Sequence, residues 1–270
     1  MAEPIRLVHT SGASAVVHPH GAHVTSWIPA GGGEALFVSR AAKFQPGTAI
    51  RGGVPVIFPQ FGTLGPLPKH GFARTERWHT VDWLPSRAVF GLRDSERTRE
   101  VWPHAFRAEL AVEVEERRLS IRLSVTNTQA APFSFTAALH TYLRVADVGR
   151  AAVAGLQGLS YRDAHAGDET RVERERELRV DGELDRVYMD VPAELRVRDE
   201  AGGRILRLRS EGFSDAVVWN PGADGAAALP DMQPGEEREM LCVEAAEVAV
   251  PVFLGPGVTW RGAQVLEVEG

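Results

Sequence analysis

A strict alternation of apolar and polar residues constrains the fold of this chain more than any other feature. In residues 119–127, "LSIRLSVTN", every second side chain is apolar, and residues 110–114 follow the same pattern. A period of two places one set of side chains on each face of a strand. The two segments therefore predict a hairpin of half-buried strands that turns near Glu115 to Arg118.

The same alternation predicts two further hairpins. "ASAVVHPHGAHVTSW" surrounds a Pro-Gly turn, and "ELRVRDEAGGRILRLRSE" turns at Asp199 to Gly203. Strand patterns recur about every ten residues between clusters of Gly, Pro, Asp and Asn, which is typical of a sandwich or a barrel. No segment predicts an amphipathic helix longer than two turns. We therefore expect one all-β domain over residues 1–270, built as a large antiparallel β-sandwich.

One charged segment, "DETRVERERELRVDGELDR" at residues 168–186, alternates in charge sign. Charges along a strand prevent edge-to-edge pairing with another molecule. We expect this segment to form a solvated edge strand.

Composition limits the function classes. The 270 residues carry a net charge of −6, which argues against nucleic acid as the main partner. No apolar run is long enough to span a membrane, and no signal peptide precedes the first strand. The single cysteine, Cys242, excludes an internal disulfide and fits a reducing compartment. We expect a cytoplasmic monomer with no nucleic-acid or membrane partner.

The stretch "IRGGVPVIFPQFGTLGPLPKHGFAR" contains no carboxylate. Between Glu34 and Glu76 there is no Asp or Glu at all, although acidic residues make up 36 of the 270. The same window holds five basic residues: Arg40, Lys43, Arg51, Lys69 and Arg74. Such a local cationic surface predicts an anion site, since Arg binds phosphate or carboxylate bidentately. The alternative is a rigid structural loop whose arginines pair with carboxylates elsewhere.

Two strand segments carry candidate acid–base residues. In "FSFTAALHTYLRV" the period of two places His140 and Tyr142 on the polar face, away from the core. In "EMLCVEAAEVAVPVFL" it places Glu244 on one face with Met240 and Cys242. A carboxylate among apolar neighbours has a raised pKa, which suits a general base. The alternatives are a structural histidine with one hydrogen bond and a buried salt bridge.

The remaining motifs are weak or missing. "HPHGAH" places His18, His20 and His23 within six residues, but a turn separates them and no acid follows, so we do not assign a metal site. The sequence has no dinucleotide-binding fingerprint, phosphate-binding loop, nucleophile elbow or zinc-protease motif. We expect no cofactor and no metal, and any bound phosphate would belong to the substrate.

Six segments in order resemble one family. They are "KFQPGTAIRGGVPVIFPQFG", "LPKHGFAR", "LHTYLRVADV", "DRVYMD", "DAVVWNP" and "MLCVEAAEVAVPVFLGPGVTW". Together they closely resemble the hexose-6-phosphate mutarotases, or glucose-6-phosphate 1-epimerases, within the aldose 1-epimerase group. The resemblance covers nearly the whole chain. It implies a galactose-mutarotase-like β-supersandwich that interconverts the α and β anomers of a hexose 6-phosphate.

The resemblance also implies roles for individual residues. His140 would be the acid and Glu244 the base, opening and closing the sugar ring without a redox or metal step. His70 and Asp185 would bind the sugar. The phosphate would be held by the basic residues of the acid-free window, Arg51, Arg74 and Lys69.

The sequence departs from the family in one loop. The family often has "NPW" before an acidic and lysine-containing run, whereas this chain has "NPGADGAAALPDM" with Gly222 in place of the Trp. The departure argues against a phosphate or sugar contact from this loop, and hence against tight specificity for glucose 6-phosphate. A mutarotase of unphosphorylated aldoses and a non-catalytic carbohydrate-binding sandwich remain alternatives.

Overall fold

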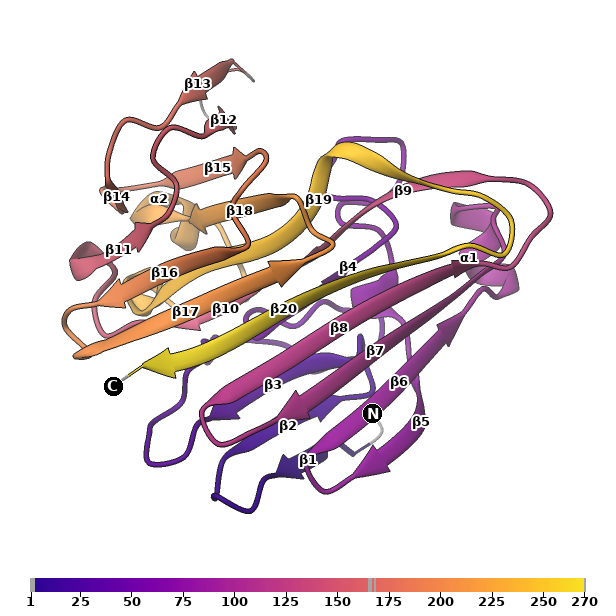
Figure 1. Cartoon of the computed structure of the whole chain (residues 1–270), viewed down its shortest axis with the longest axis horizontal. Helices are drawn as coiled ribbons and strands as arrows, with labels where there is room; N and C mark the ends of the chain where they lie inside the picture. The colour runs from indigo at the N-terminus through magenta and orange to yellow at the C-terminus, as the bar shows by residue number, and fades with distance from the viewer. Residues whose placement is uncertain (1–2, 165–166, 168, 270) are drawn as a thin grey trace.

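The computed structural model describes residues 3–164, 167 and 169–269. Two large antiparallel sheets dominate it, and a small sheet of three strands lies below β7 and β8 in Figure 1. The small sheet has the order β1-β2-β3, with β1 (Ile5–Val8), β2 (Ser14–His18) and β3 (His23–Ile28).

One large sheet has eight strands and forms the base of the site described below. Its order is β13-β12-β15-β18-β19-β9-β4, with β10 also paired to β19. The strands are β13 (Thr170–Val172), β12 (Ser160–Asp163), β15 (Leu184–Tyr188), β18 (Asp215–Asn220), β19 (Met240–Leu254), β9 (Phe133–Leu139), β4 (Val56–Ile57) and β10 (Tyr142–Arg144).

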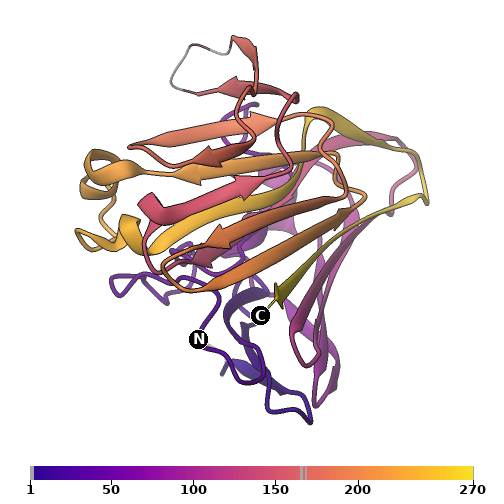
Figure 2. The same ribbon diagram turned by 60° about the vertical axis from the view of Figure 1, so that its left-hand side comes forward.

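The other large sheet has nine strands in the order β14-β11-β16-β17-β20-β8-β7-β6-β5. They are β14 (Glu177–Arg179), β11 (Ala151–Ala154), β16 (Glu194–Asp199), β17 (Arg204–Glu211), β20 (Thr259–Glu269), β8 (Arg118–Asn127), β7 (Phe106–Val114), β6 (Arg87–Arg93) and β5 (His79–Leu84). Both large sheets thus combine strands from the two halves of the chain. In Figure 2 the indigo N-terminal strands and the orange strands of the second half lie at opposite ends of the view.

Helices are short in the described part of the chain. They are α1 (Glu96–Val101), α2 (Gly222–Ala227) and three 3₁₀ turns, Ala73–Thr75, Val148–Arg150 and Glu236–Glu239. None is long and apolar enough to cross a membrane. The all-β prediction and the expected lack of long helices are confirmed.

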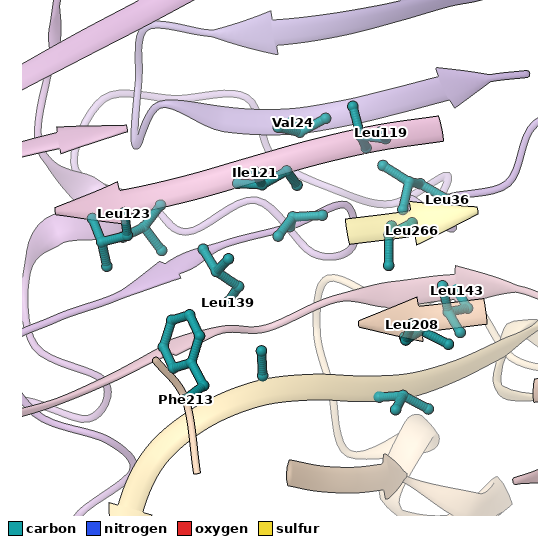
Figure 3. Packing of buried hydrophobic residues seen from close by; sticks show 14 of the residues in the cluster. Val24, Leu36, Leu119, Ile121, Leu123, Leu139, Leu143, Leu208, Phe213 and Leu266 are labelled. Carbon is teal, nitrogen blue, oxygen red and sulfur yellow. The ribbon is translucent and has the colours of Figure 1, made fainter. Parts of the chain in front are cut away.

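The core follows the alternation of the sequence. Leu119, Ile121 and Leu123 of β8 are buried in one cluster with Leu139 and Leu143, and Figure 3 shows these residues among the packed side chains of that cluster. The three predicted hairpins are also confirmed, as β2–β3, β7–β8 and β16–β17. The β7–β8 turn closes with the Glu115 amide donating to the Arg118 carbonyl at 2.9 Å.

The charged segment 168–186 was predicted as one edge strand, and this is wrong in part. Its first residue lies outside the described residues. The rest forms two edge strands in different sheets, β13 and β14, before entering β15, an interior strand. Between the two edges the Glu173 carboxylate is buried, where it accepts hydrogen bonds from Tyr188 and Arg186. This buried anchor turns the chain from one sheet to the other, which charge alternation alone cannot predict.

An aromatic cluster fixes the stretch that precedes the site. Phe58 is fully buried and contacts the rings of Phe72, Trp102, Phe106 and Phe135 at centroid distances of 5.1–6.1 Å. Its carbonyl accepts the amides of Phe72 and Ala73 at 3.1 Å. The cluster therefore ties the Arg51 segment to the segment that carries His70 and Arg74.

Replacing this ring tests how far the site depends on the cluster. We expect Phe58→Ala to lower the free energy of unfolding by about 3–5 kcal/mol, because the cavity is lined by rigid rings. Phe253, whose ring is 70% exposed, provides the control. Phe253→Ala should change the free energy by no more than about 0.5 kcal/mol in the same urea titrations. An equal loss of unfolding free energy in the two variants would contradict the stabilising role assigned to the Phe58 cluster.

Candidate active site

A pocket of about 330 Å³ lies over the eight-stranded sheet. All seven candidate residues from the sequence line it, together with apolar and aromatic side chains. The candidates are Arg51, Lys69, His70, Arg74, His140, Asp185 and Glu244. Other lining residues include Phe61, Leu64, Tyr142, Arg162, Val187, Val217, Trp219, Leu229 and Val248.

Strand register explains how the pocket base is assembled. In the eight-stranded sheet, Val187 of β15 lies opposite Val217 of β18, which lies opposite Glu244 of β19. Paired residues point to the same face of a sheet, so these side chains form one row. The predicted faces are therefore correct: Phe133 and Phe135 lie in the main core, whereas Glu244 points into the pocket.

His140 and Glu244 contact each other in the pocket. Nδ1 of His140 lies 3.2 Å from Oε1 of Glu244, and the residues are 7% and 2% exposed. His140 follows the last residue of β9, where its amide donates to the Pro55 carbonyl at 3.0 Å. The angles at the contact do not fit a hydrogen bond, which leaves Nδ1 of His140 without a hydrogen-bond partner among the described residues, and Oε2 of Glu244 has none there either. The two groups thus lie close together and retain free bonding capacity for a ligand.

Burial sets the protonation of this pair. It raises the pKa of Glu244 well above its ordinary value, and the Asp185 carboxylate adds to the shift while Arg74 opposes it. Burial also holds the pKa of His140 well below its ordinary value, and positive charge at His70, Arg74 and Arg51 acts in the same direction. Both shifts favour the uncharged form, which is a protonated Glu244 and a neutral His140.

The basic residues of the acid-free window divide into two groups. Arg51 donates through Nε to Oδ1 of Asp231 at 3.2 Å and through Nη1 to the Tyr142 hydroxyl at 3.1 Å. Burial opposes the charge on Arg51, but Tyr142 and Asp231 raise its pKa above the ordinary value. Arg40, by contrast, pairs with Glu236 and Glu239 outside the pocket. The structural alternative is thus correct for Arg40, whereas Arg51 lines the pocket.

Arg74 lies beside Arg51 and forms no salt bridge within the described part of the chain. Its Nη2 donates to the Lys69 carbonyl at 3.1 Å, and its buried Nε has no hydrogen-bond partner among the described residues. Burial lowers the pKa of Arg74 and Arg51 acts in the same direction, whereas Tyr142, Asp231 and Glu244 oppose the shift. A guanidinium group in this position is stabilised by an anion, so Arg51, Arg74 and the exposed Lys69 form a cationic wall. We use this term for these three residues below.

His70 and Asp185 lie on other sides of the pocket. Nδ1 of His70 accepts the Gly62 amide at 3.2 Å, which leaves the proton of the neutral ring on Nε2. Burial and the nearby cations Arg74, Lys69 and Arg51 lower the pKa of His70 to about 3, so the ring is neutral at pH 7. Asp185 belongs to β15 and lies opposite Trp219 of β18.

Two glycines allow the Arg51 segment to pass close to its neighbours. Gly52 and Gly53 have φ angles of +109° and +64°, which L side chains rarely adopt. A Cβ atom at either position would collide with the backbone of Phe37 or Val24. Glycine at both positions of "RGG" therefore follows from this close backbone approach.

Sequence reasoning gave no role to several pocket residues. It placed Tyr142 on the polar face with His140, and Tyr142 lines the pocket. Arg162 and Trp219 lie on the strands β12 and β18, and no sequence pattern assigned them to the site. Asp231 and Leu229 come from the loop that departs from the family, and this loop reaches the site: Leu229 lines the pocket and Asp231 binds Arg51.

Two histidines of "HPHGAH" bond to backbone carbonyls within the fold. His23 is buried, its pKa is lowered to about 3 mainly by burial, and its Nε2 donates to the Gly52 carbonyl at 2.7 Å. Nε2 of His20 lies 2.7 Å from the Thr48 carbonyl. Among the described residues, no group of three or more His, Cys, Asp or Glu side chains could hold a metal ion.

Comparison with known proteins agrees with the fold and identifies the family. The family model for aldose 1-epimerase matches residues 3–267. A protein of Cenchrus ciliaris named "Putative glucose-6-phosphate 1-epimerase" is 37% identical over 96% of this chain and 83% of its own length. A crystal structure from Salmonella typhimurium described as "a putative mutarotase" has a TM-score of 0.90 at 30% identity, covering 98% of this chain and 90% of that one.

A more distant structure shows the fold alone. A galactose mutarotase related enzyme from Lactobacillus acidophilus has a TM-score of 0.80 at 14% identity, over 99% of this chain and 98% of that one. The fold is thus a galactose-mutarotase-like β-sandwich, and the class of protein is an isomerase that acts on a small sugar. The chain belongs to the aldose 1-epimerase family.

The raised pKa of Glu244 has a consequence for stability. Folding holds this carboxyl protonated, whereas the unfolded chain ionises it above about pH 4.3. Its stabilising contribution is therefore present at low pH and is lost as the pH rises toward the folded-state pKa. Glu244→Gln keeps the shape without the ionisation, so we expect it to be more stable than the wild type at pH 8, by about 0.5–2 kcal/mol.

Urea unfolding at pH 5 and pH 8 measures this difference. The advantage of Glu244→Gln should be smaller at pH 5. Glu169→Gln, which changes a side chain that is 75% exposed, should show no advantage at either pH. A Glu244→Gln variant that is less stable than the wild type at pH 8 would contradict the protonation assigned here.

Proposed function

We propose that this protein interconverts the α and β anomers of a hexose 6-phosphate, with glucose 6-phosphate as the first candidate. The observation that carries the proposal is Arg74, a half-buried cation that forms no salt bridge with a described residue, beside Arg51 in the pocket that holds His140 and Glu244. A phosphate group would supply a directly bound negative charge. The names of the relatives from Cenchrus ciliaris and Escherichia coli, both "Putative glucose-6-phosphate 1-epimerase", support the same substrate.

In the proposed mechanism, Glu244 and His140 exchange protons with the sugar. Glu244 as the carboxylate accepts the proton of the anomeric hydroxyl, and His140 as the imidazolium donates a proton to the ring oxygen. The ring opens to the aldehyde, the C1–C2 bond rotates, and closure from the other face reverses both transfers. Acid–base catalysis of this kind is worth about 10²–10⁴-fold.

Burial favours the uncharged forms of both groups, so the ionised pair of the mechanism has to form in the substrate complex. Oε1 of Glu244 and Nδ1 of His140 are 3.2 Å apart without hydrogen-bond angles, so each group exchanges its proton with the sugar and not with the other group. A phosphate at the cationic wall would offset Arg74 and Arg51, which oppose protonation of His140, and would favour the imidazolium. The same phosphate would offset Arg74 at Glu244, where this cation favours the carboxylate.

His70 and Asp185 would bind the sugar between the pair and the wall. Nε2 of His70 carries the ring proton and can donate to a hydroxyl group. Asp185 can accept from sugar hydroxyls. The Trp219 ring, perpendicular to His140 at 6.0 Å, provides an apolar surface beside them.

A mutarotase of unphosphorylated aldoses is the second candidate, and one observation favours it. Asp231 binds Arg51 through Nε, which offsets part of the positive charge of the wall. One experiment distinguishes the two candidate functions, which differ in whether the sugar is phosphorylated. Freshly dissolved α-glucose 6-phosphate and α-glucose are followed with dehydrogenases selective for the β anomers. Acceleration of the phosphate alone supports the proposal, and acceleration of glucose alone replaces it with the second candidate.

Substitution of the acid–base pair tests the mechanism. We expect His140→Ala and Glu244→Gln each to lower kcat by about 10²–10⁴-fold, since each removes one proton transfer. Binding of glucose 6-phosphate, followed by calorimetry, should remain within a few-fold of the wild type. Near-wild-type turnover in either variant would remove that residue from the mechanism.

Substitution in the cationic wall tests the substrate. We expect Arg74→Ala to raise KM for glucose 6-phosphate by about 10–100-fold, as for the loss of charge-assisted hydrogen bonds, and to leave KM for glucose nearly unchanged. Arg51→Ala should act in the same direction. The matched control is Lys43→Ala, from the same acid-free window but outside the pocket, which should change neither value. An equal loss for both sugars in the arginine variants would exclude a phosphate site at this wall.

A further inference from the structure

Tyr142 lies where the acid–base pair meets the cationic wall. It is the first residue of β10, its Cα is paired with that of Cys242 on β19, and it is 2% exposed. Phe37, Met240 and Cys242 belong to the same buried cluster. The ring is therefore fixed by packing on the side away from the pocket, while the residue lines the pocket on the other side.

The ring of Tyr142 stacks on the ring of His140. The two centroids are 4.8 Å apart and the planes differ by 11°. Trp219 lies perpendicular to both rings, at 6.0 Å from His140 and 5.9 Å from Tyr142. These two aromatic contacts restrict rotation of the imidazole and keep its Nδ1 directed at Glu244, 3.2 Å away.

The hydroxyl of Tyr142 contacts the cationic wall, whereas its ring contacts His140. It accepts a hydrogen bond from Nη1 of Arg51 at 3.1 Å, while Nε of the same guanidinium is held by Asp231. Burial raises the pKa of Tyr142, so the hydroxyl keeps its own hydrogen. No described residue accepts that hydrogen, which leaves it available to an anion bound at the wall.

We propose that Tyr142 is the positioning residue of this site: its ring orients His140 for proton transfer, and its hydroxyl orients Arg51 for phosphate binding. The proposal rests on the proposed function. It assigns separate kinetic consequences to two parts of one side chain. A ring that served only to pack the core would give neither consequence, since its stability effect would be the same for every substrate.

Two substitutions at Tyr142 separate the role of the ring from the role of the hydroxyl. Tyr142→Phe keeps the stacked ring and removes the hydroxyl, so we expect KM for glucose 6-phosphate to rise about tenfold, with kcat and KM for glucose within twofold of the wild type. Tyr142→Leu also removes the flat ring, so we expect kcat to fall by about 10²-fold as the imidazole loses its orientation. The pH dependence of kcat should shift in Tyr142→Leu and stay unchanged in Tyr142→Phe.

Tyr188→Phe is the matched control. Tyr188 is a fully buried tyrosine of strand β15 in the same sheet, and its hydroxyl donates to Glu173 at 2.7 Å, away from the pocket residues. The substitution should alter stability and leave both kinetic constants unchanged. If Tyr142→Leu does not fold, Tyr142→Met, another flexible side chain without a flat ring, replaces it.

The outcomes distinguish this inference from the proposed function. A wild type that is inactive on glucose 6-phosphate but active on glucose overturns the proposed substrate, and the kcat of Tyr142→Leu on glucose still tests the ring. Calorimetric binding of inorganic phosphate tests the hydroxyl without turnover and should weaken about tenfold in Tyr142→Phe. Unchanged phosphate binding and KM in Tyr142→Phe would overturn the role of the hydroxyl. An unchanged kcat and pH profile in Tyr142→Leu would overturn the role of the ring.

Discussion

The site depends on a contact that a flexible structure would not keep: a histidine and a glutamate, both buried, 3.2 Å apart. A buried carboxyl group is costly unless it is neutral or paired, and the surrounding chain relaxes if it can. Here it cannot, because Glu244 lies within the long strand β19 and His140 lies between β9 and β10, which both pair with β19. The adjacent Thr141 carbonyl accepts the Val243 amide at 3.1 Å, so the backbone fixes both groups.

The cationic wall is likewise a set of ionisable groups that the fold holds in place despite an energetic cost, but its charge is positive. Asp231 and Tyr142 bind Arg51, whereas Arg74 has only the Lys69 carbonyl as a hydrogen-bond partner among the described residues. A half-buried guanidinium without a carboxylate destabilises the empty protein. The fold tolerates this cost at a position facing a pocket, where a bound anion would remove it. Uncompensated charge at a concave surface is typical of a binding site and not of a structural core.

Some of this site could be predicted from the sequence, because a period of two fixes the face of a residue whatever the tertiary structure. That rule placed His140 and Glu244 on their faces correctly, and the absence of acids around Arg51 indicated the cationic wall. The resemblance to a family added His70 and Asp185. Asp231 could not be predicted, since its loop has no period and is directed by long-range bonds from the Asn220 side chain to the carbonyls of Glu237 and Met240. The raised pKa of Glu244 was predicted from its apolar neighbours, whereas the lowered pKa of His140 depends on burial and on cations from other segments and could not be predicted.

The cationic wall is close enough to the acid–base pair to shift the pKa of His140. In the proposed function, this electrostatic coupling would link recognition of the phosphate to the rate of the reaction. Arg51 and Arg74 lower the pKa of His140, so an empty wall keeps the acid uncharged. A substrate that brings a phosphate offsets those charges and favours the imidazolium, whereas an unphosphorylated sugar leaves them in place. Discrimination would then appear in kcat as well as in KM, because the group that is recognised also sets the charge of the catalytic acid. Tyr142, in contact with both His140 and Arg51, is the shortest physical link between the two effects.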